Sequence, residues 1–247
     1  MRKLLAIIGT LILISPSFAS AAIAFDAAKG VTAASASSNT TSFTAGTLTN
    51  GFIIWEGNDS CGGLPCILSS SNISGVTYNG ASLTRLDAFC DVLAPGVSVF
   101  YGYAPASGAN NVVVSYSASQ TTRYTVATYQ GVNQSNWLDA SSTVYESAST
   151  AEITNTLTPV AANTWGIQVG SMGGPGTLTG NYTVRGNTSG SGSSGRFIQD
   201  TNATISGATT MLFDTTSANQ GCGKMYSIAP AVAATPKNET FYLNQWI

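Results

Sequence analysis

The chain has 247 residues, and only 8% of them are charged, whereas about 25% is usual for a globular protein. Nine basic residues against eleven acidic ones give a net charge of -2, so the sequence lacks the basic surplus that nucleic-acid binding requires. Histidine is absent, which excludes Ser-His-Asp triads, Cys-His dyads and His-ligated metal sites. Hydrophobic residues make up 43% of the chain, enough for a folded core.

The N-terminus has the three parts of a secretory signal peptide. Arg2 and Lys3 form a basic start, Leu4–Ile14 is an apolar run, and Ala19–Ala21 supplies a small-residue cleavage site. The apolar run is shorter than the roughly 20 residues that a membrane-spanning helix needs. The sequence therefore predicts a signal peptide at residues 1–21 and a secreted or cell-surface protein with no membrane span after cleavage. The alternative is an uncleaved membrane anchor.

Beyond the signal peptide, short runs rich in β-branched and aromatic residues predict strands, and no stretch has sustained helical spacing. Several runs alternate, as where Val97, Val99 and Tyr101 fall on one face of a strand. The clearest runs are residues 51–55, 97–103, 111–116, 123–129 and 164–169. The composition also disfavours helix, because Ser, Thr, Asn and Gly replace Lys and Glu. We expect an all-β, antiparallel protein.

The densest polar and aromatic cluster follows the first of these strands, at Trp55, Glu56, Asn58 and Asp59. A tryptophan beside these side chains can stack on a sugar ring while they hydrogen-bond its hydroxyls, and the same oxygens can ligate calcium. The alternative is structural: the tryptophan belongs to the core and Asn58-Asp59 makes a turn. Trp137 and Asp139 form a second, smaller ligand-binding candidate with the same two interpretations.

Four cysteines in an exported chain predict two disulfides. Cys61 and Cys66 enclose a Gly/Pro stretch that can fold back tightly, which leaves Cys90 to pair with Cys222. The alternative, a metal site ligated by all four cysteines, lacks a second closely spaced pair. We therefore expect no metal and no cofactor.

One hairpin can be placed by residue. Val76–Tyr78 and Ala81–Leu83 flank Asn79-Gly80, the strongest signal for a two-residue type I′ turn. This register sets Tyr78 opposite Ala81 and Thr77 opposite Ser82.

The organisation predicted for the mature chain is one domain, residues 22–235, followed by a tail or closing edge strand at residues 236–247. Residues 188–195 form a Gly/Ser run that is typical of an exposed loop rather than of a domain boundary. We expect a jelly-roll-like β-sandwich of two packed antiparallel sheets.

The order of these strands and turns resembles a secreted β-sandwich module, jelly-roll or concanavalin-like, that occurs in bacterial surface proteins and phage appendages. The resemblance covers most of the mature chain and lies in residues 23–28, 73–85, 97–114 and 129–139. Its motifs specify strands and turns, so it implies the fold and the exported class and carries no catalytic residues over.

Catalysis has little support in the sequence. Glu56 and Asp59 are the best pair for a glycosidase, but no E-x-D-x-E strand or G-x-S-x-G elbow is present. We expect a non-catalytic structural or adhesive surface or appendage protein that associates with itself or with envelope components. The alternatives are a carbohydrate-binding module and, more remotely, a glycoside hydrolase using that carboxylate pair.

Overall fold

The computed structural model describes residues 21–59, 71–90, 96–173, 178–188 and 195–232, and these contain strands and turns but no helix. The expectation of an all-β antiparallel protein is confirmed. In chain order the strands are β1 (Ala24–Ala45), β2 (Phe52–Asp59), β3 (Ile73–Tyr78), β4 (Ala81–Ser82), β5 (Thr84–Phe89), β6 (Gly96–Tyr103), β7 (Gly108–Gln130), β8 (Leu138–Ser141), β9 (Tyr145–Leu157), β10 (Trp165–Met172), β11 (Leu178–Gly180), β12 (Thr183–Asn187), β13 (Gly195–Asp200) and β14 (Thr209–Ile228).

The first sheet has the order β4-β3-β7-β2-β6-β5, with β1 added to β7. The long strand β7 changes partner along its length: its first part pairs with β3 and its last part with β2. The two ends of the path, β4 and β5, are separated in the chain by Leu83 alone. The sheet therefore curls into a nearly closed barrel, and the prediction of a plain jelly-roll-like two-sheet sandwich is wrong in this respect.

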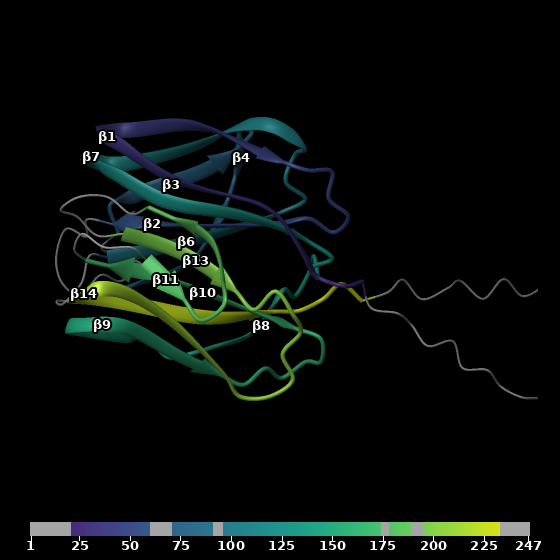
Figure 1. Cartoon of the computed structure of the whole chain (residues 1–247). Helices are drawn as coiled ribbons and strands as arrows, with labels where there is room; N and C mark the ends of the chain where they lie inside the picture. Colours follow the sequence, from purple (N-terminus) through teal and green to yellow (C-terminus); the bar gives the residue numbers. More distant parts are fainter. Residues whose placement is uncertain (1–20, 60–70, 91–95, 174–177, 189–194, 233–247) are drawn as a thin grey trace, which may run out of the picture.

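The second sheet repeats this plan. Its order is β11-β14-β10-β13-β12, and β9 and β8 also pair with β14. The first and last strands of this order, β11 and β12, are joined by only Asn181 and Tyr182. Figure 1 shows β1, β3 and β7 of the first sheet on one side of the molecule, and β9 and β14 of the second on the other.

The two halves also share their registers. Asp59 pairs with Gly96 at the end of β2, and Met172 pairs with Gly195 at the end of β10. From β5 to β7, each residue has the same strand partners as the residue 99 positions later in the second half, as for Gly96 and Gly195 or Tyr129 and Ile228. The bulge at Leu86 in β5 likewise recurs at Arg185 in β12. A short sequence repeat, Ser-Gly-Ala at residues 107–109 and again at 206–208, accompanies this match. The fold thus contains the same curled-sheet arrangement twice in succession.

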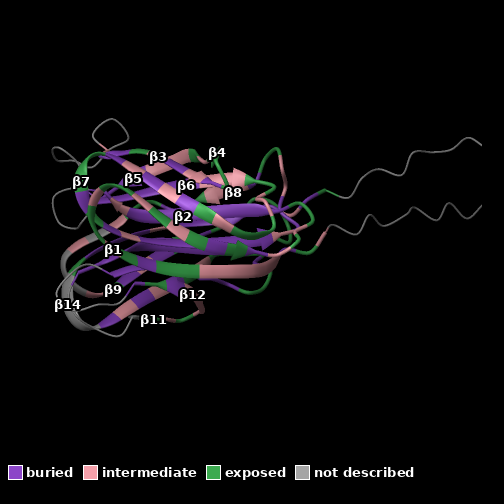
Figure 2. Ribbon diagram, turned by 90° about the horizontal axis from the view of Figure 1, so that it is seen from above, coloured by how far each residue is buried: buried purple, intermediate pink, exposed green. Residues whose placement is uncertain are grey.

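Both faces of β2 are buried, which explains its almost wholly apolar sequence. Ile53 and Trp55 point into the first barrel, whereas Phe52 and Ile54 join a core layer shared with the second sheet. The second sheet contributes Trp165, Ile167, Val169 and Ile228 to this shared layer. Smaller hydrophobic clusters fill the interior of the second half. Figure 2 shows buried stretches (purple) along the strands through the middle of the molecule.

Most local predictions are confirmed. All five predicted strands are present, although residues 111–116 and 123–129 belong to the single strand β7. The hairpin pairs Tyr78 with Ala81 and Thr77 with Ser82, and its turn residues have the positive φ values that such a turn requires, 49° at Asn79 and 78° at Gly80.

The disulfide between Cys90 and Cys222 is present, with a Cα–Cα distance of 5.9 Å. It is consistent with an oxidising, extracellular-type location. Cys61 and Cys66 lie outside the described residues, as do residues 1–20, most of the Gly/Ser run and the predicted tail. The domain boundaries stay predictions. In the described ranges no helix is long and apolar enough to cross a membrane.

Candidate functional site

Trp55, the aromatic member of the first candidate cluster, lies inside the first barrel with no exposed surface. Its ring packs 5.5 Å from Phe100 and 5.4 Å from Tyr124, measured between ring centroids. Because β2 continues through residue 59, its alternation places Glu56 on the opposite face from Trp55 and Asp59. The sequence therefore brings these side chains close in the chain, but the strand separates them into two layers.

Glu56 is fully buried in the layer between the two sheets, where it accepts a hydrogen bond of 2.6 Å from the Thr125 hydroxyl. Burial raises the pKa of Glu56 from its ordinary 4.5 to about 8, although the charge of Arg196 and the Thr125 hydrogen bond act in the opposite direction. Arg196 is also fully buried, and its guanidinium has no hydrogen-bond partner among the described residues. Burial lowers the pKa of Arg196 to about 10, while Glu56 acts to raise it.

Asp59 and Asn58 hold the end of β2 in place. Asp59 accepts hydrogen bonds from the Ser98 hydroxyl, at 2.6 Å, and from the Asn72 backbone, at 2.7 Å. Asn58 accepts from the Arg123 backbone at 2.6 Å and donates to a carbonyl of β7. Glu56 and Asp59 therefore do not face a common cleft, as the carboxylate pair of a glycosidase must.

The second candidate pair is likewise built into the fold. Trp137 is buried in the shared core, and its ring lies 4.7 Å from that of Phe52 and 4.9 Å from that of Tyr101. Asp139 accepts two backbone hydrogen bonds, from Val160 and Ala161, which cap the turn after β9.

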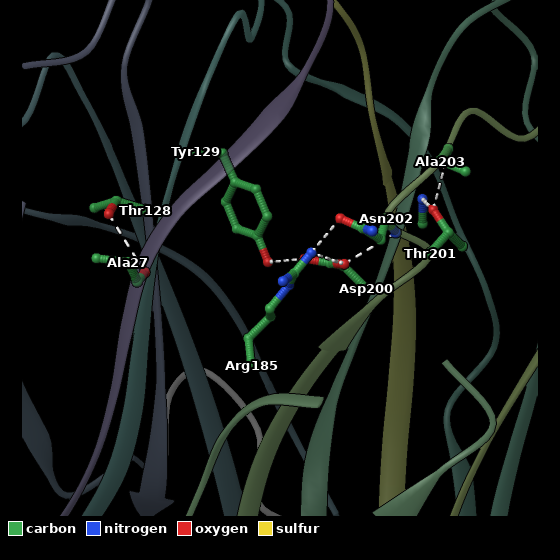
Figure 3. Close-up of polar contacts among 9 residues, drawn as sticks. Ala27, Thr128, Tyr129, Arg185, Asp200, Thr201, Asn202 and Ala203 are labelled. Atoms are coloured by element: carbon green, nitrogen blue, oxygen red, sulfur yellow. Dashed lines mark hydrogen bonds and ion pairs between the residues drawn. The ribbon is translucent and has the colours of Figure 1, made fainter. Parts of the chain in front are cut away.

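A polar cluster that the sequence did not indicate joins the two halves. Arg185 donates two hydrogen bonds to Asp200, at 2.8 and 3.0 Å, and the Tyr129 hydroxyl of the first half donates a third at 3.0 Å. Figure 3 shows Tyr129 and Arg185 converging on the Asp200 carboxylate from different strands. Arg185 also lies over the Phe25 ring, 4.0 Å from its centroid. Burial and the Asp200 carboxylate raise the pKa of Tyr129 well above its usual value.

In a second cluster, the carboxylate comes from the first half and both of its partners come from the second. Asp87 of the first half accepts hydrogen bonds from Lys224, at 2.6 Å, and from the Tyr226 hydroxyl, at 3.2 Å, both on β14. Each half thus contributes a carboxylate that a tyrosine and a cation bind, with the tyrosine always from the other half. No local pattern marks these residues, because their sequence separations are set by the tertiary fold.

A groove of about 620 Å³ lies beside β3. It is lined by β3, by Ser82 and Leu83 of the hairpin, by Arg85 of β5 and by Phe100 of β6. A smaller pocket of about 160 Å³ lies under the other side of the hairpin, next to Tyr103. In the part of the chain that the structure describes, no three acidic or cysteine side chains gather closely enough to hold a metal ion.

No family model matches the chain, and neither a curated protein nor a solved structure matches it. The likeness to secreted β-sandwich modules therefore rests on the sequence pattern alone. Taken together, Trp55, Glu56 and Trp137 are buried in the interior, and the oxygens of Asn58, Asp59 and Asp139 accept backbone hydrogen bonds.

Proposed function

We propose that the protein is a non-catalytic structural component of a cell surface or appendage, and that it assembles with copies of itself. The observation that supports this most is the use of its aromatic and acidic side chains. Trp55, Glu56 and Trp137, the residues best suited to chemistry or sugar stacking, are at most 3% exposed.

The links between the halves also suit a load-bearing or packing role. The Cys90–Cys222 disulfide joins the end of β5 in the first half to β14 in the second. The Tyr129–Asp200 hydrogen bond and the partly exposed Lys224–Asp87 ion pair also cross between the halves. Such links hold the two curled sheets in a fixed relation, as a structural subunit requires.

Light scattering on the mature protein over a range of concentrations tests the proposal. We expect species larger than the monomer to accumulate as the concentration rises, together with no hydrolysis in a broad screen of polysaccharides. A monomer at every concentration would contradict self-assembly.

The second candidate function is carbohydrate binding, and Tyr103 favours it. This ring is 38% exposed, packs against Tyr101 at 5.6 Å, and borders the smaller pocket together with Asn79 and Ser82. A glycan array read with the mature protein and with Tyr103→Ala tests this. Saturable binding that the substitution removes, and that Val160→Ala at another exposed position leaves intact, would favour the binding module over the structural component.

A further inference from the structure

Six connections between strands gather at one end of the molecule, the end where the described chain begins and finishes (right in Figure 1). Backbone hydrogen bonds join neighbouring segments there: Val132 donates to the Asn50 carbonyl, and Asn133 donates to the Ala229 carbonyl. Thr164 and Ile205 form a β-bridge between two connections of the second half. The six connections are residues 46–51, 79–80, 104–107, 131–137, 158–164 and 201–208.

This end of the molecule is uncharged. None of the six connections contains a charged residue, and neither do residues 21–23 or 229–232. Two carboxylates at the adjoining strands accept hydrogen bonds from the turns, Asp26 from the Gly46 backbone at 2.9 Å and Asp139 from the Val160 backbone at 2.8 Å. Because charged residues are depleted at the centre of protein interfaces and keep free surfaces apart, a surface without them favours association with a second surface of the same kind.

Exposed apolar side chains concentrate at the same end. Four large hydrophobic side chains are exposed in the ranges that the structure describes, and three of them, Tyr103, Val160 and Val232, lie here. Val160 is 84% exposed, and its turn is held in place because the Val160 and Ala161 backbones each donate a hydrogen bond of 2.8 Å to Asp139. An apolar side chain that is both exposed and held in position is suited to anchor an interface.

A pocket of matching size and chemistry lies at the same end. The pocket of about 160 Å³ runs between the hairpin and residues 104–106, with the buried side chains of Ile53 and Tyr78 in its lining and Tyr103 beside them. No charged residue lines it. A cavity of about 150 Å³ is large enough to hold benzene, so a valine side chain fits in this one.

The pocket and the exposed valine belong to different halves. When the halves are matched through their registers, residues 79–83 have no counterpart, because Tyr182 and Thr183 are adjacent where Tyr78 and Thr84 are not. The hairpin that borders the pocket is therefore a feature of the first half, whereas Val160 follows β9 in the second.

We infer that this uncharged end is an interface between two copies, in which Val160 of each copy enters the pocket beside Tyr103 of the other. The inference rests on the proposed self-assembly and names the surface that carries it. Because the pocket and Val160 lie on one surface, a two-fold axis brings both pairs into contact at once. Such an interface uses up the same patch on both copies, so it closes into a dimer.

Two variants of the mature protein separate the inserted side chain from the pocket. Val160→Lys changes a side chain that is 84% exposed in the monomer, but in the interface it places an unpaired charge in an apolar pocket. Ala81→Trp adds an indole at an exposed position that lines the pocket. Val144→Lys is the matched control, because Val144 is 39% exposed but lies between β8 and β9, outside the six connections.

Light scattering over a range of concentrations gives the dissociation constant of the dimer, and circular dichroism verifies that each variant is folded. We expect Val160→Lys and Ala81→Trp each to raise this constant by about 100-fold or more, because each change occurs twice in a two-fold interface. An equimolar mixture of the two keeps one intact contact and should dimerise more tightly than either variant alone. Val144→Lys should assemble like the wild type.

The remaining outcomes contradict the inference. If either variant assembles like the wild type, if the mixture gains nothing over its components, or if Val144→Lys weakens the dimer equally, the inference is wrong while the proposed self-assembly survives. If the wild-type protein is itself monomeric at every concentration, both are wrong.

Discussion

The two halves of the molecule, β1–β7 and β8–β14, use one arrangement of strands with different side chains in their interiors. The cross-strand pair Trp55 and Phe100 in the first half corresponds to Gln168 and Gln199 in the second. The aromatic rings of the first pair meet edge to face, whereas the amides of the second pair hydrogen-bond to each other. Both Trp55 and Gln168 are fully buried.

The polar interior of the second half is satisfied as a network. Gln168 donates to the Asn155 side chain at 2.8 Å, Asn155 donates to the Gly223 carbonyl at 3.2 Å, and Gln199 donates to the Leu212 carbonyl at 2.9 Å. Buried amides are tolerated in a core when they have such partners. The curled sheet therefore depends on its register and bulge more than on one kind of core.

The largest expected effect comes from the covalent link between the halves. Replacing both Cys90 and Cys222 by Ala removes a cross-link between residues 132 positions apart. We expect the free energy of unfolding to fall by about 4–5 kcal/mol, because the unfolded chain gains the loop entropy that the disulfide withheld. Urea unfolding followed by tryptophan fluorescence measures this. An unchanged midpoint would show that the halves hold together without the link.

The next effect compares the two interiors. Trp55→Ala leaves a large cavity among Phe100 and Tyr124, and we expect a loss of about 3–5 kcal/mol. Gln168→Ala removes the hydrogen bonds that Gln168 makes with Asn155 and Gln199, and we expect a smaller loss of about 1–3 kcal/mol. Urea unfolding of both variants gives the difference. Equal losses would mean that the polar network stabilises its half as strongly as the aromatic core.

How far the sequence predicts this structure depends on the range of the interaction. The strand at residues 97–103 and the turn at Asn79-Gly80 follow from local pattern, because alternation and positive φ are properties of neighbouring residues. The curling of the sheets does not, since it arises where β7 and β14 change partners along their length. The environment of the candidate site is also set at long range: Trp55 and Glu56 are adjacent in the sequence, but the elements that bury the two faces of β2 come from elsewhere in the chain.

The two polar clusters between the halves differ in burial, and their stabilities should differ accordingly. Asp200 is fully buried, so Asp200→Asn leaves the Arg185 charge poorly compensated, and we expect a loss of about 3 kcal/mol. Asp87 and Lys224 are 21% and 18% exposed, so Asp87→Asn should cost about 1 kcal/mol and less at high salt. Thermal or urea unfolding at low and high salt measures both. A larger loss in Asp87→Asn would reverse the assigned order.

A slope with pH tests the layer where the two halves meet. The pKa of Glu56 is about 8 in the folded protein against an ordinary 4.5, because burial disfavours the charged carboxylate. Between these values the unfolded chain releases the proton while the folded chain keeps it. The free energy of unfolding therefore falls as pH rises from about 4.5 to about 8, by at most about 1.4 kcal/mol per pH unit from this group.

Glu56→Gln removes this titration while its side-chain oxygen can still accept the Thr125 hydrogen bond. We expect urea unfolding of the variant to depend less on pH over this range than that of the wild type. Glu152→Gln, at an exposed position of β9, is the control and should keep the wild-type slope. If Glu56→Gln keeps that slope as well, the carboxyl of Glu56 is ionised in the folded protein, and its charge is then balanced by Arg196 across the layer between the two halves.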